Sequence, residues 1–477
     1  MKKLHTLLIL LAFLGLILTP FCAFAVDWSG TKNFTSNTTI NDNITLVGST
    51  TIGVYANVTV TINGVITSGN ESFSLTITGD GGTVVFNAAN TYYGETKVGN
   101  ATLRLGTNGR IDNSKALTLT WYTACKFEIT SDDKKVKKLN SEYATAEVSL
   151  ANRSLYIGTS ATSNDGGGTF KGVFTGSGNI IKTGTQTLTL TGANTYSGGT
   201  YIDAGKLVIG ESGTIASSSG VTFHYANTKL EIQGGDKWIK TLYSNHTNSE
   251  VILGSNYLYI GSSFTSDDGG GTFAGKFSGS GGIVKRGTQT LTLSGQSTHT
   301  GITNIDAGTL KLTTNNAIAA SGGVTFYNPN TKLEIATGNT SSTHIKSINS
   351  THANSEIIIT GNAWLDIGTS TTSDDGGGTF AGVISGTGNL AKWGTKTFTL
   401  TGHDAFTGKT EINSGKLVLA QAGNDTHHSS GVTLKSGSKL VIKSGDILCF
   451  YCGCDTILCS LPFWNRAGIL TMQIFSK

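Results

Sequence analysis

Three copies of an Asp-Gly-Gly-Gly sequence are the residues whose type and spacing most suggest chemistry. They begin at Asp165, Asp268 and Asp375, and each follows an Asn or an Asp. Carboxylate and backbone oxygens are ligands that Ca²⁺ prefers. The motif nevertheless differs from the nonapeptide Ca²⁺ repeat, which requires Gly-Gly-x-Gly-x-Asp. We therefore predict turns in which the Asp accepts backbone N–H bonds, and no metal site.

The histidines do not form a recurring catalytic set. Most are singletons, expected in turns or on polar strand faces, while His427-His428 is expected in a loop; the singletons are His224, His246, His299, His344, His352 and His403. A nucleophilic triad needs a carboxylate and a serine beside the histidine, and no such pair recurs at one position. Paired carboxylates of the glycosidase kind stay open, but the candidate acids recur with the repeats and are interpreted as structural. We expect no catalytic residue and no cofactor.

The cysteines are concentrated at the end of the chain. Cys125 stands alone in the body, whereas Cys449, Cys452, Cys454 and Cys459 lie close together. Their spacing loosely resembles a zinc or iron–sulfur site, but exported proteins seldom carry such sites. We predict no metal here, and a fold that does not depend on disulfides.

All of the Asp-Gly-Gly-Gly copies lie in a unit that recurs along the chain. Its clearest blocks run from Gly176 to Gly198 and from Gly279 to Gly301, a third ends at Gly408, and a worn copy ends at Gly94. The final glycines are separated by 104, 103 and 107 residues. Such a period indicates one structural unit that is stacked or strung along the chain. It argues against an enzyme, because catalysis usually needs one asymmetric set of residues.

Alternation of apolar and polar residues predicts strands throughout the body. Every second residue is apolar in Val58–Ile62, Leu188–Leu190 and Leu291–Leu293, which turns one face to a core and the other to water. Threonine is β-branched and supports the extended backbone, and glycine pairs and triples mark tight turns. We expect no helix after residue 25, and we interpret Lys134–Ala146 as a strand and a turn.

Two all-β architectures fit units of about 104 residues. In a parallel β-helix, stacked turns enclose a continuous aliphatic core. In the alternative, each unit is an Ig-like β-sandwich, which would need clear boundaries, a packed central Trp and richer linkers. Only Pro329 and Pro462 follow residue 25, so a continuous body is favoured. We predict a parallel β-helix, with tandem β-sandwich domains as the alternative.

The repeated block resembles the autotransporter-associated β-strand repeat, of the passenger-associated-transport-repeat family. The resemblance lies in Gly-x-Gly-x-Ile/Leu-x-Lys-x-Gly-Thr-x-Thr-Leu-Thr-Leu-Thr-Gly-x-Asn-Thr-Tyr-Ser-Gly-Gly-Thr, followed by Ile202-Asp-Ala-Gly205-Lys-Leu207. It is strong over 176–210, good over 279–312 and 386–419, and weak over 79–105, about a third of the chain in all. It implies a Gram-negative surface or secreted protein whose passenger is a right-handed parallel β-helix. It also implies repeats that help the passenger to emerge and fold outside the cell.

The end of the chain departs from this family pattern. The resemblance implies a C-terminal outer-membrane barrel, and we expect this chain to lack one. The repeat continues to Gly445-Asp446, which aligns with Gly235-Asp236, and the composition then changes within two residues. We interpret residues 447–477 as a Cys-rich non-repeat tail, produced by a frameshift or truncation.

The first residues predict export. Lys2 and Lys3 precede an apolar run from Leu7 to Leu18, and Ala23-Phe24-Ala25 offers small residues for signal peptidase. We predict a signal peptide over 1–25; a membrane anchor is the alternative, but the run is short for a span of about 20 residues. The net charge is +4 and only 13% of residues are charged. Such a surface is not built to bind nucleic acid.

These observations predict four regions and one function. After the signal peptide come a β-helical region over 26–106 with one degenerate repeat, a repeat body over 107–446, and the tail. We expect an exported, structural and adhesive protein without catalytic activity, whose partners are host or cell-surface glycans or proteins and the outer-membrane secretion machinery. The alternatives are a polysaccharide-degrading enzyme on the same scaffold, or an inert truncated fragment held in the periplasm.

Overall fold

A computed structural model describes residues 25–120, 125–338, 342–402, 404–420, 429–443 and 469–473. The predicted signal peptide, except Ala25, and most of the tail with its four cysteines lie outside the described residues, so those predictions stay predictions. The described residues form strands and turns but no helix, which confirms the all-β prediction. None of them belongs to a helix able to span a membrane.

The described chain divides into two compact units. Unit 1 comprises residues 1–137 and 145–147, and unit 2 comprises residues 138–144 and 148–477. This division follows contacts in space, whereas the boundaries at 106 and 446 were drawn from the repeats and stay a prediction. Lys134–Ala146 holds strands β12 (Lys134–Val136) and β13 (Leu139–Ser141), which confirms its interpretation as strand and turn.

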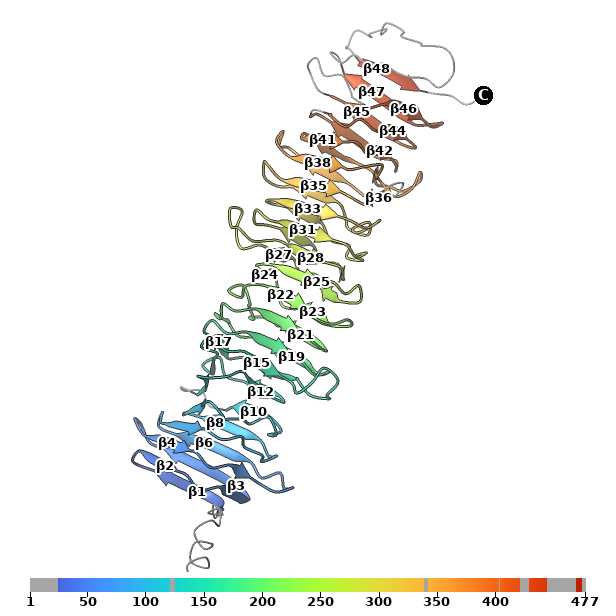
Figure 1. Ribbon diagram of the computed structural model, residues 1–477. Helices are drawn as coiled ribbons and strands as arrows, with labels where there is room; N and C mark the ends of the chain where they lie inside the picture. Colours follow the sequence, from blue (N-terminus) through green and yellow to red (C-terminus); the bar gives the residue numbers. More distant parts are fainter. Residues whose placement is uncertain are drawn as a thin grey trace, which may run out of the picture. The chain divides into compact units, whose positions relative to one another are not determined.

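Unit 1 contains two ladders of parallel strands (Figure 1). The first ladder consists of β1 (Val26–Phe34), β3 (Ile44–Val54), β6 (Leu75–Gly79), β8 (Thr96–Gly99) and β10 (Leu117–Leu119), with β5 (Ile66–Thr67) also paired to β3. The second consists of β2 (Thr38–Ile40), β4 (Thr59–Ile62), β7 (Thr83–Phe86), β9 (Thr102–Leu105) and β11 (Lys126–Ile129). Each strand pairs with one that lies a full turn away in sequence.

Unit 2 contains four parallel ladders, which we number in chain order. Ladder I consists of β13, β16 (Gly168–Phe170), β19 (Thr187–Leu190), β21 (Lys206–Ile209), β23 (Lys229–Ile232), β26 (Glu250–Ile252) and β29 (Lys276–Ser278). Ladder II consists of β15 (Leu155–Ile157), β18 (Ile180–Lys182), β20 (Thr200–Ile202), β22 (Val221–Phe223), β25 (Leu242–Ser244), β28 (Gly271–Phe273), β31 (Thr290–Leu293), β33 (Thr309–Leu312), β35 (Lys332–Ile335), β38 (Glu356–Ile359) and β41 (Val383–Gly386).

The other two ladders begin later in the chain. Ladder III consists of β24 (Lys237–Ile239), β27 (Leu258–Ile260), β30 (Ile283–Lys285), β32 (Thr303–Ile305), β34 (Val324–Phe326), β37 (Ile348–Ser350), β40 (Gly378–Phe380), β43 (Thr397–Leu400), β45 (Lys416–Leu419) and β47 (Lys439–Lys443). Ladder IV consists of β36 (Ser342–Ile345), β39 (Trp364–Ile367), β42 (Asn389–Lys392), β44 (Lys409–Ile412) and β46 (Gly431–Leu434). Strands β14 (Glu147–Ser149) and β17 (Val173–Thr175) complete the described set, apart from β48.

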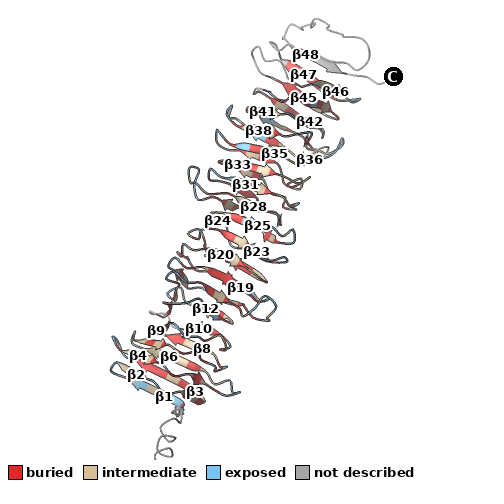
Figure 2. Cartoon of the chain, in the orientation of Figure 1, coloured by how far each residue is buried: buried red, intermediate tan, exposed pale blue. Residues whose placement is uncertain are grey.

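Inward aliphatic side chains produce this stacking, as the alternation predicts. Leu188 pairs in register with Leu207, Leu207 with Leu230, and Leu230 with Val251, and all four are fully buried. Burying one such side chain contributes roughly 1.5–3 kcal/mol, and alternate residues such as Thr189 and Glu231 keep contact with solvent; Figure 2 shows how buried and more exposed residues are distributed along the strands. The chain is therefore a parallel β-solenoid. The tandem-sandwich alternative is wrong, because sandwiches are built from antiparallel sheets.

One repeat is not a whole number of turns. Starting from Leu188, four successive pairings in ladder I lead to Phe277. Leu291, the counterpart of Leu188 one repeat and 103 residues later, lies instead in ladder II. The next counterpart, Phe398, lies in ladder III. Equivalent residues of successive repeats therefore move from one side of the solenoid to the next.

Part of the predicted tail does form a strand. Strand β48 (Ile469–Gln473) pairs with β47, with Leu440 opposite Met472. This pairing is antiparallel, unlike the ladders that precede it. The frameshift predicted near Asp446 falls outside the described residues.

Candidate ligand-contact surface

A buried lysine marks the same position in each clear repeat of unit 2. Lys182, Lys285 and Lys392 end β18, β30 and β42 and are at most 1% exposed. Lysine is almost never fully buried unless its ammonium is paired. Its burial here was missed by sequence reasoning, although a charged residue that recurs inside an apolar strand was a usable signal.

Backbone carbonyls satisfy each of these ammonium groups. Lys182 Nζ donates to the carbonyl oxygens of Thr183 and Gly184, at 2.9 and 2.6 Å, and to that of Ala204 in the following turn, at 3.0 Å. Lys285 and Lys392 repeat the arrangement with their own three carbonyls. Burial lowers the pKa of all three lysines to about 8, so the ammonium form still predominates at pH 7. The lysine links successive corners of the solenoid.

The Asp-Gly-Gly-Gly sequences form turns, as the sequence predicts. Asp165 Oδ1 accepts the N–H of Thr159 at 3.1 Å, Oδ2 accepts its hydroxyl at 2.6 Å, and the Ser163 hydroxyl also donates to this carboxylate. Asp268 and Asp375 have the same kinds of partner. Protein donors thus occupy the carboxylate oxygens that a Ca²⁺ ion would need. Among the described residues, no cluster of three or more His, Cys, Asp or Glu side chains could hold a metal ion.

Two glycines allow the Asp165 turn to pack closely against the corner of the solenoid that follows Lys182. One glycine, Gly184, lies in that corner, and the other, Gly166, lies in the Asp-Gly-Gly-Gly turn. Gly184 has φ +74°, and a Cβ there would lie 2.5 Å from the Asp165 carbonyl oxygen. Gly166 has φ +76°, and a Cβ there would collide with the Thr183 carbonyl oxygen. Both positions need a left-handed backbone and a close approach, which only glycine combines without strain.

Several outward positions differ between repeats, whereas many of the inward positions carry the same residue. Inward positions carry the same residues, as in Leu155, Leu258 and Leu365. We call the outward residues on four successive strands of one ladder a display row. The first row is Tyr156, Ile181, Tyr201 and Thr222 in ladder II; the second is Tyr259, Val284, Asn304 and Thr325 in ladder III; the third is Asp366, Ala391, Glu411 and Thr433 in ladder IV.

An aromatic stack lies at the start of the second row. The rings of Trp238 on β24 and Tyr259 on β27 have centroids 4.7 Å apart and an interplanar angle of 11°. The guanidinium carbon of Arg286 lies 4.5 Å from the Tyr259 ring centroid and 4.9 Å from that of Phe264, distances at which cation–π attraction operates. We call Trp238, Tyr259, Phe264 and Arg286 the aromatic platform.

The third row places a histidine beside a buried carboxyl group. Asp366 is 4% exposed, and its Oδ2 lies 3.5 Å from His344 Nδ1. Burial raises the pKa of Asp366 to about 6, against the opposing effect of His344 and with a smaller contribution from Glu411 in the same direction. Asp366 Oδ1 has no hydrogen-bond partner among the described residues.

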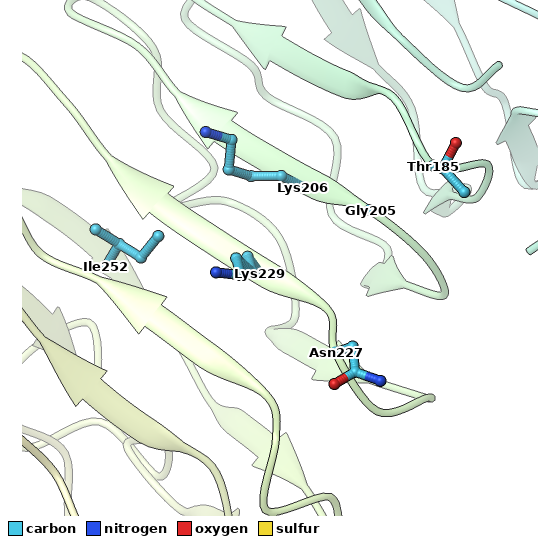
Figure 3. A pocket seen from close by; sticks show the side chains of 6 residues that line it. All are labelled: Thr185, Gly205, Lys206, Asn227, Lys229 and Ile252. Carbon is cyan, nitrogen blue, oxygen red and sulfur yellow. The ribbon is translucent and has the colours of Figure 1, made fainter. Parts of the chain in front are cut away.

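Ladder I carries a shallow hollow (Figure 3). It has a volume of about 280 Å³ and is lined by Thr185, Gly205, Lys206, Asn227, Lys229 and Ile252. Lys206 Nζ lies 2.7 Å from Glu231, and Lys229 Nζ lies 2.9 Å from Glu250. Both ammonium groups are therefore already paired, and the hollow offers no unmatched charge for an anion.

Comparisons with known proteins bear on the repeats. The family model described as passenger-associated-transport-repeat matches residues 180–209, 283–312 and 390–419. Three segments of the chain thus resemble this repeat. Each match begins on a strand that ends in a buried lysine, which is β18, β30 or β42. The matches end with strands β21, β33 and β45, respectively. The buried lysines are thus part of the repeat itself.

A curated relative agrees with this family. The adhesin BmaC autotransporter of Brucella suis biovar 1 (strain 1330) is 35% identical over 147 residues, which are 30% of this chain. The match spans only 4% of that protein's length. No solved structure matches the chain. The repeats and this relative confirm the predicted resemblance to an autotransporter passenger.

The described histidines of unit 2 make separate contacts. His224 Nδ1 lies 2.8 Å from Asp203, and its ring stacks on Tyr201, whereas His246 and His352 contact backbone carbonyls through Nε2. His299 is fully buried, so the expectation of a turn or polar face is wrong for this residue. Neither His224 nor His344 has a serine hydroxyl as a hydrogen-bond partner in the described chain. His403 and His427-His428 lie outside the described residues.

Two further sets of residues are Cys125, which the sequence singled out, and the aromatic platform, which it did not. Cys125 in unit 1 is a buried thiol that forms no disulfide. The aromatic platform was missed by sequence reasoning, because Trp238, Tyr259 and Arg286 are separated by about one turn each and only the register brings them together.

Proposed function

We propose that the chain is an exported autotransporter passenger whose β-solenoid acts in adhesion, through broad contacts with host or cell-surface glycans or proteins. Passenger-associated-transport repeats and similarity to an adhesin support export to the cell surface or secretion. The relative is named an adhesin, which supports a non-enzymatic role.

The observation that carries the proposal is that the residues inside the solenoid recur from repeat to repeat, whereas residues of the display rows change. The frame residues, inward aliphatics and buried lysines, are kept from repeat to repeat, whereas a row position in contact with solvent changes from Tyr201 to Asn304 and Glu411. A purely structural rod has no need of such diversity on its outward positions. Different outward chemistry on one scaffold is what binding to several surface groups requires.

We further propose that the repeats assist export by folding in sequence. Each strand of a ladder pairs with the strand one turn earlier, so a turn can fold as soon as the preceding turn exists. The export machinery would then be a transient partner of an unfolded chain. The truncated, periplasmic fragment predicted as an alternative stays a prediction.

Binding to intact cells tests adhesion. The chain without residues 1–25, labelled with a fluorophore, is incubated with cultured epithelial cells and with bacterial cells. We expect saturable binding that excess unlabelled chain displaces and that prior heat-unfolding of the chain abolishes. No displaceable binding to any of these cells would overturn the adhesive function. Release of reducing ends from polysaccharides by the same preparation would favour the enzyme instead.

A further inference from the structure

Several of the most exposed aromatic side chains of unit 2 lie in one short stretch of its sequence. Tyr225, Trp238, Tyr243 and Phe264 are between 39% and 56% exposed and fall within residues 225–264, whereas Tyr327, at 59%, lies outside it. Single exposed apolar side chains are normal on a protein surface, whereas exposed rings that pack against one another indicate a contact surface. Two of the four, Trp238 and Phe264, belong to the aromatic platform.

The indole of Trp238 is partly open to a ligand. Strand β24, which carries Trp238, is the first strand of ladder III, so no strand of this ladder precedes it. Tyr259 stacks on one face of the indole. Trp238 is nevertheless 39% exposed, so part of the ring is in contact with solvent.

The end of the stack away from Trp238 is occupied by Arg286. Arg286 lies against both Tyr259 and Phe264, and its Nε donates to Asp306 Oδ2 at 3.1 Å. The guanidinium group has five N–H donors, and the Arg286 side chain keeps 23% of its surface exposed. The guanidinium group therefore closes the stack on the side of Tyr259 that faces away from Trp238.

The charge of the platform argues against an anionic ligand. Asp306 neutralises Arg286. Burial raises the pKa of Tyr259, and the carboxylates of Asp236 and Asp306 raise it further while Arg286 opposes them. Arg286, the cation of the platform, is thus already paired, and sialylated, sulfated or uronic-acid ligands would find no unmatched cation there.

The size of the platform argues against a protein partner. A standard protein interface buries about 800 Å² on each partner. Beyond Tyr259, the second display row continues with Val284, which is 2% exposed, and with the short side chains of Asn304 and Thr325. An isolated aromatic face beside hydrogen-bonding groups matches a pyranose ring, which has one apolar C–H face and a rim of hydroxyl groups.

We propose that the aromatic platform binds a neutral glycan. The C–H face of one pyranose ring packs on the exposed part of the Trp238 indole. This inference rests on the proposed adhesive function and names the class of ligand for it.

Titration of the chain without residues 1–25 with oligosaccharides tests the site. The probes are neutral tetrasaccharides of glucose, galactose, mannose or N-acetylglucosamine, and sialylated or uronic-acid tetrasaccharides. We expect at least one neutral probe to bind and to change tryptophan fluorescence. Trp238→Ala should weaken that binding at least tenfold, and Trp238→Phe, which keeps a smaller face, by less. Tyr225→Ala is the matched control, an exposed aromatic outside the platform, and should stay within twofold of the parent.

Three results would overturn the inference. They are no binding of any neutral probe, binding of acidic probes alone, or equal affinity in the Trp238→Ala and Tyr225→Ala chains with unchanged circular dichroism. The cell-binding assay separates this failure from failure of adhesion itself. If Trp238→Ala adheres to cells as well as the parent chain does, adhesion stands and the platform is not its glycan site. If no chain adheres but the neutral probe binds through Trp238, the site stands and adhesion fails.

Discussion

His299 occupies the buried position that Tyr196 holds one repeat earlier. The Tyr196 hydroxyl bonds to Thr200 at 2.5 Å, and His299 Nε2 lies 3.1 Å from Thr303, the equivalent threonine. Each threonine in turn contacts a buried serine, Ser218 or Ser321. The imidazole therefore fills the place of a phenol, but its Nδ1 is left without a partner among the described residues.

This exchange predicts a loss of stability in acid. Burial lowers the pKa of His299 to about 4, from 6.5. Between these values the unfolded chain binds the proton and the folded chain does not, so stability falls as the pH drops from 6.5 towards 4. The loss is at most about 3.5 kcal/mol, at roughly 1.4 kcal/mol per pKa unit. We expect His299→Tyr to remove this part of the pH dependence, measured by urea unfolding at pH 7 and pH 4.5. Parallel pH profiles of the two chains would contradict it.

Replacing one of the buried lysines should lower the free energy of unfolding substantially, although lysine is usually a surface residue. Lys182→Met keeps an apolar stem but leaves three buried carbonyl oxygens without their donor. Unsatisfied buried polar groups cost about 1–3 kcal/mol each where they cannot relax, so we expect a loss of about 2–4 kcal/mol. Lys171→Met, at an exposed position, is the control and should stay within about 0.5 kcal/mol. Equal unfolding midpoints for the two variants would show that the ammonium group is not needed.

A pair of glycine substitutions separates close packing from backbone strain. Gly184 and Gly235 both have positive φ, +74° and +108°, but only Gly184 has another residue within reach of a Cβ. Gly235→Ala should therefore cost about 1–2 kcal/mol from the backbone alone. Gly184→Ala should cost more, because the Cβ also meets Asp165. Thermal unfolding of both variants measures the difference, and equal losses would argue against stacking of the two turns.

The Asp turns predict acid sensitivity and no response to Ca²⁺. Burial alone would raise the pKa of Asp375, but hydrogen bonds from Ser373 and Thr369 lower it overall. The carboxylate therefore stabilises the fold above its usual pKa, and this contribution is lost as the pH falls below it. Asp375→Ala should cost about 1–3 kcal/mol, against almost nothing for the exposed Asp374→Ala. Millimolar Ca²⁺ should leave the melting temperature unchanged, and a rise of several degrees would point to a metal site.

The fold was predictable from the sequence because every level of the pattern agrees. Alternation in Leu188–Leu190, glycine turns and the repeat period all require stacked strands, and the structure contains them. The turn role of Asp165 was predictable for the same reason, since its partners Thr159 and Ser163 are local in sequence.

The contact surface was not predictable, because it depends on register. Trp238 and Tyr259 are 21 residues apart, and nothing local in either strand places one ring on the other. The burial of His299 was missed for a related reason. Its position is defined by comparison with Tyr196 in the preceding repeat, and a histidine on its own indicates a polar site rather than a core.

The unequal lengths of repeat and turn have a consequence for how many surfaces the molecule can engage. Because ladders II, III and IV cycle in chain order from β36 to β41, the three display rows lie on three sides of unit 2. A flat target can meet only one of them at a time. Each added repeat thus supplies another direction of approach rather than a longer strip along one side, which suits a molecule that bridges separate bodies more than one that coats a single surface.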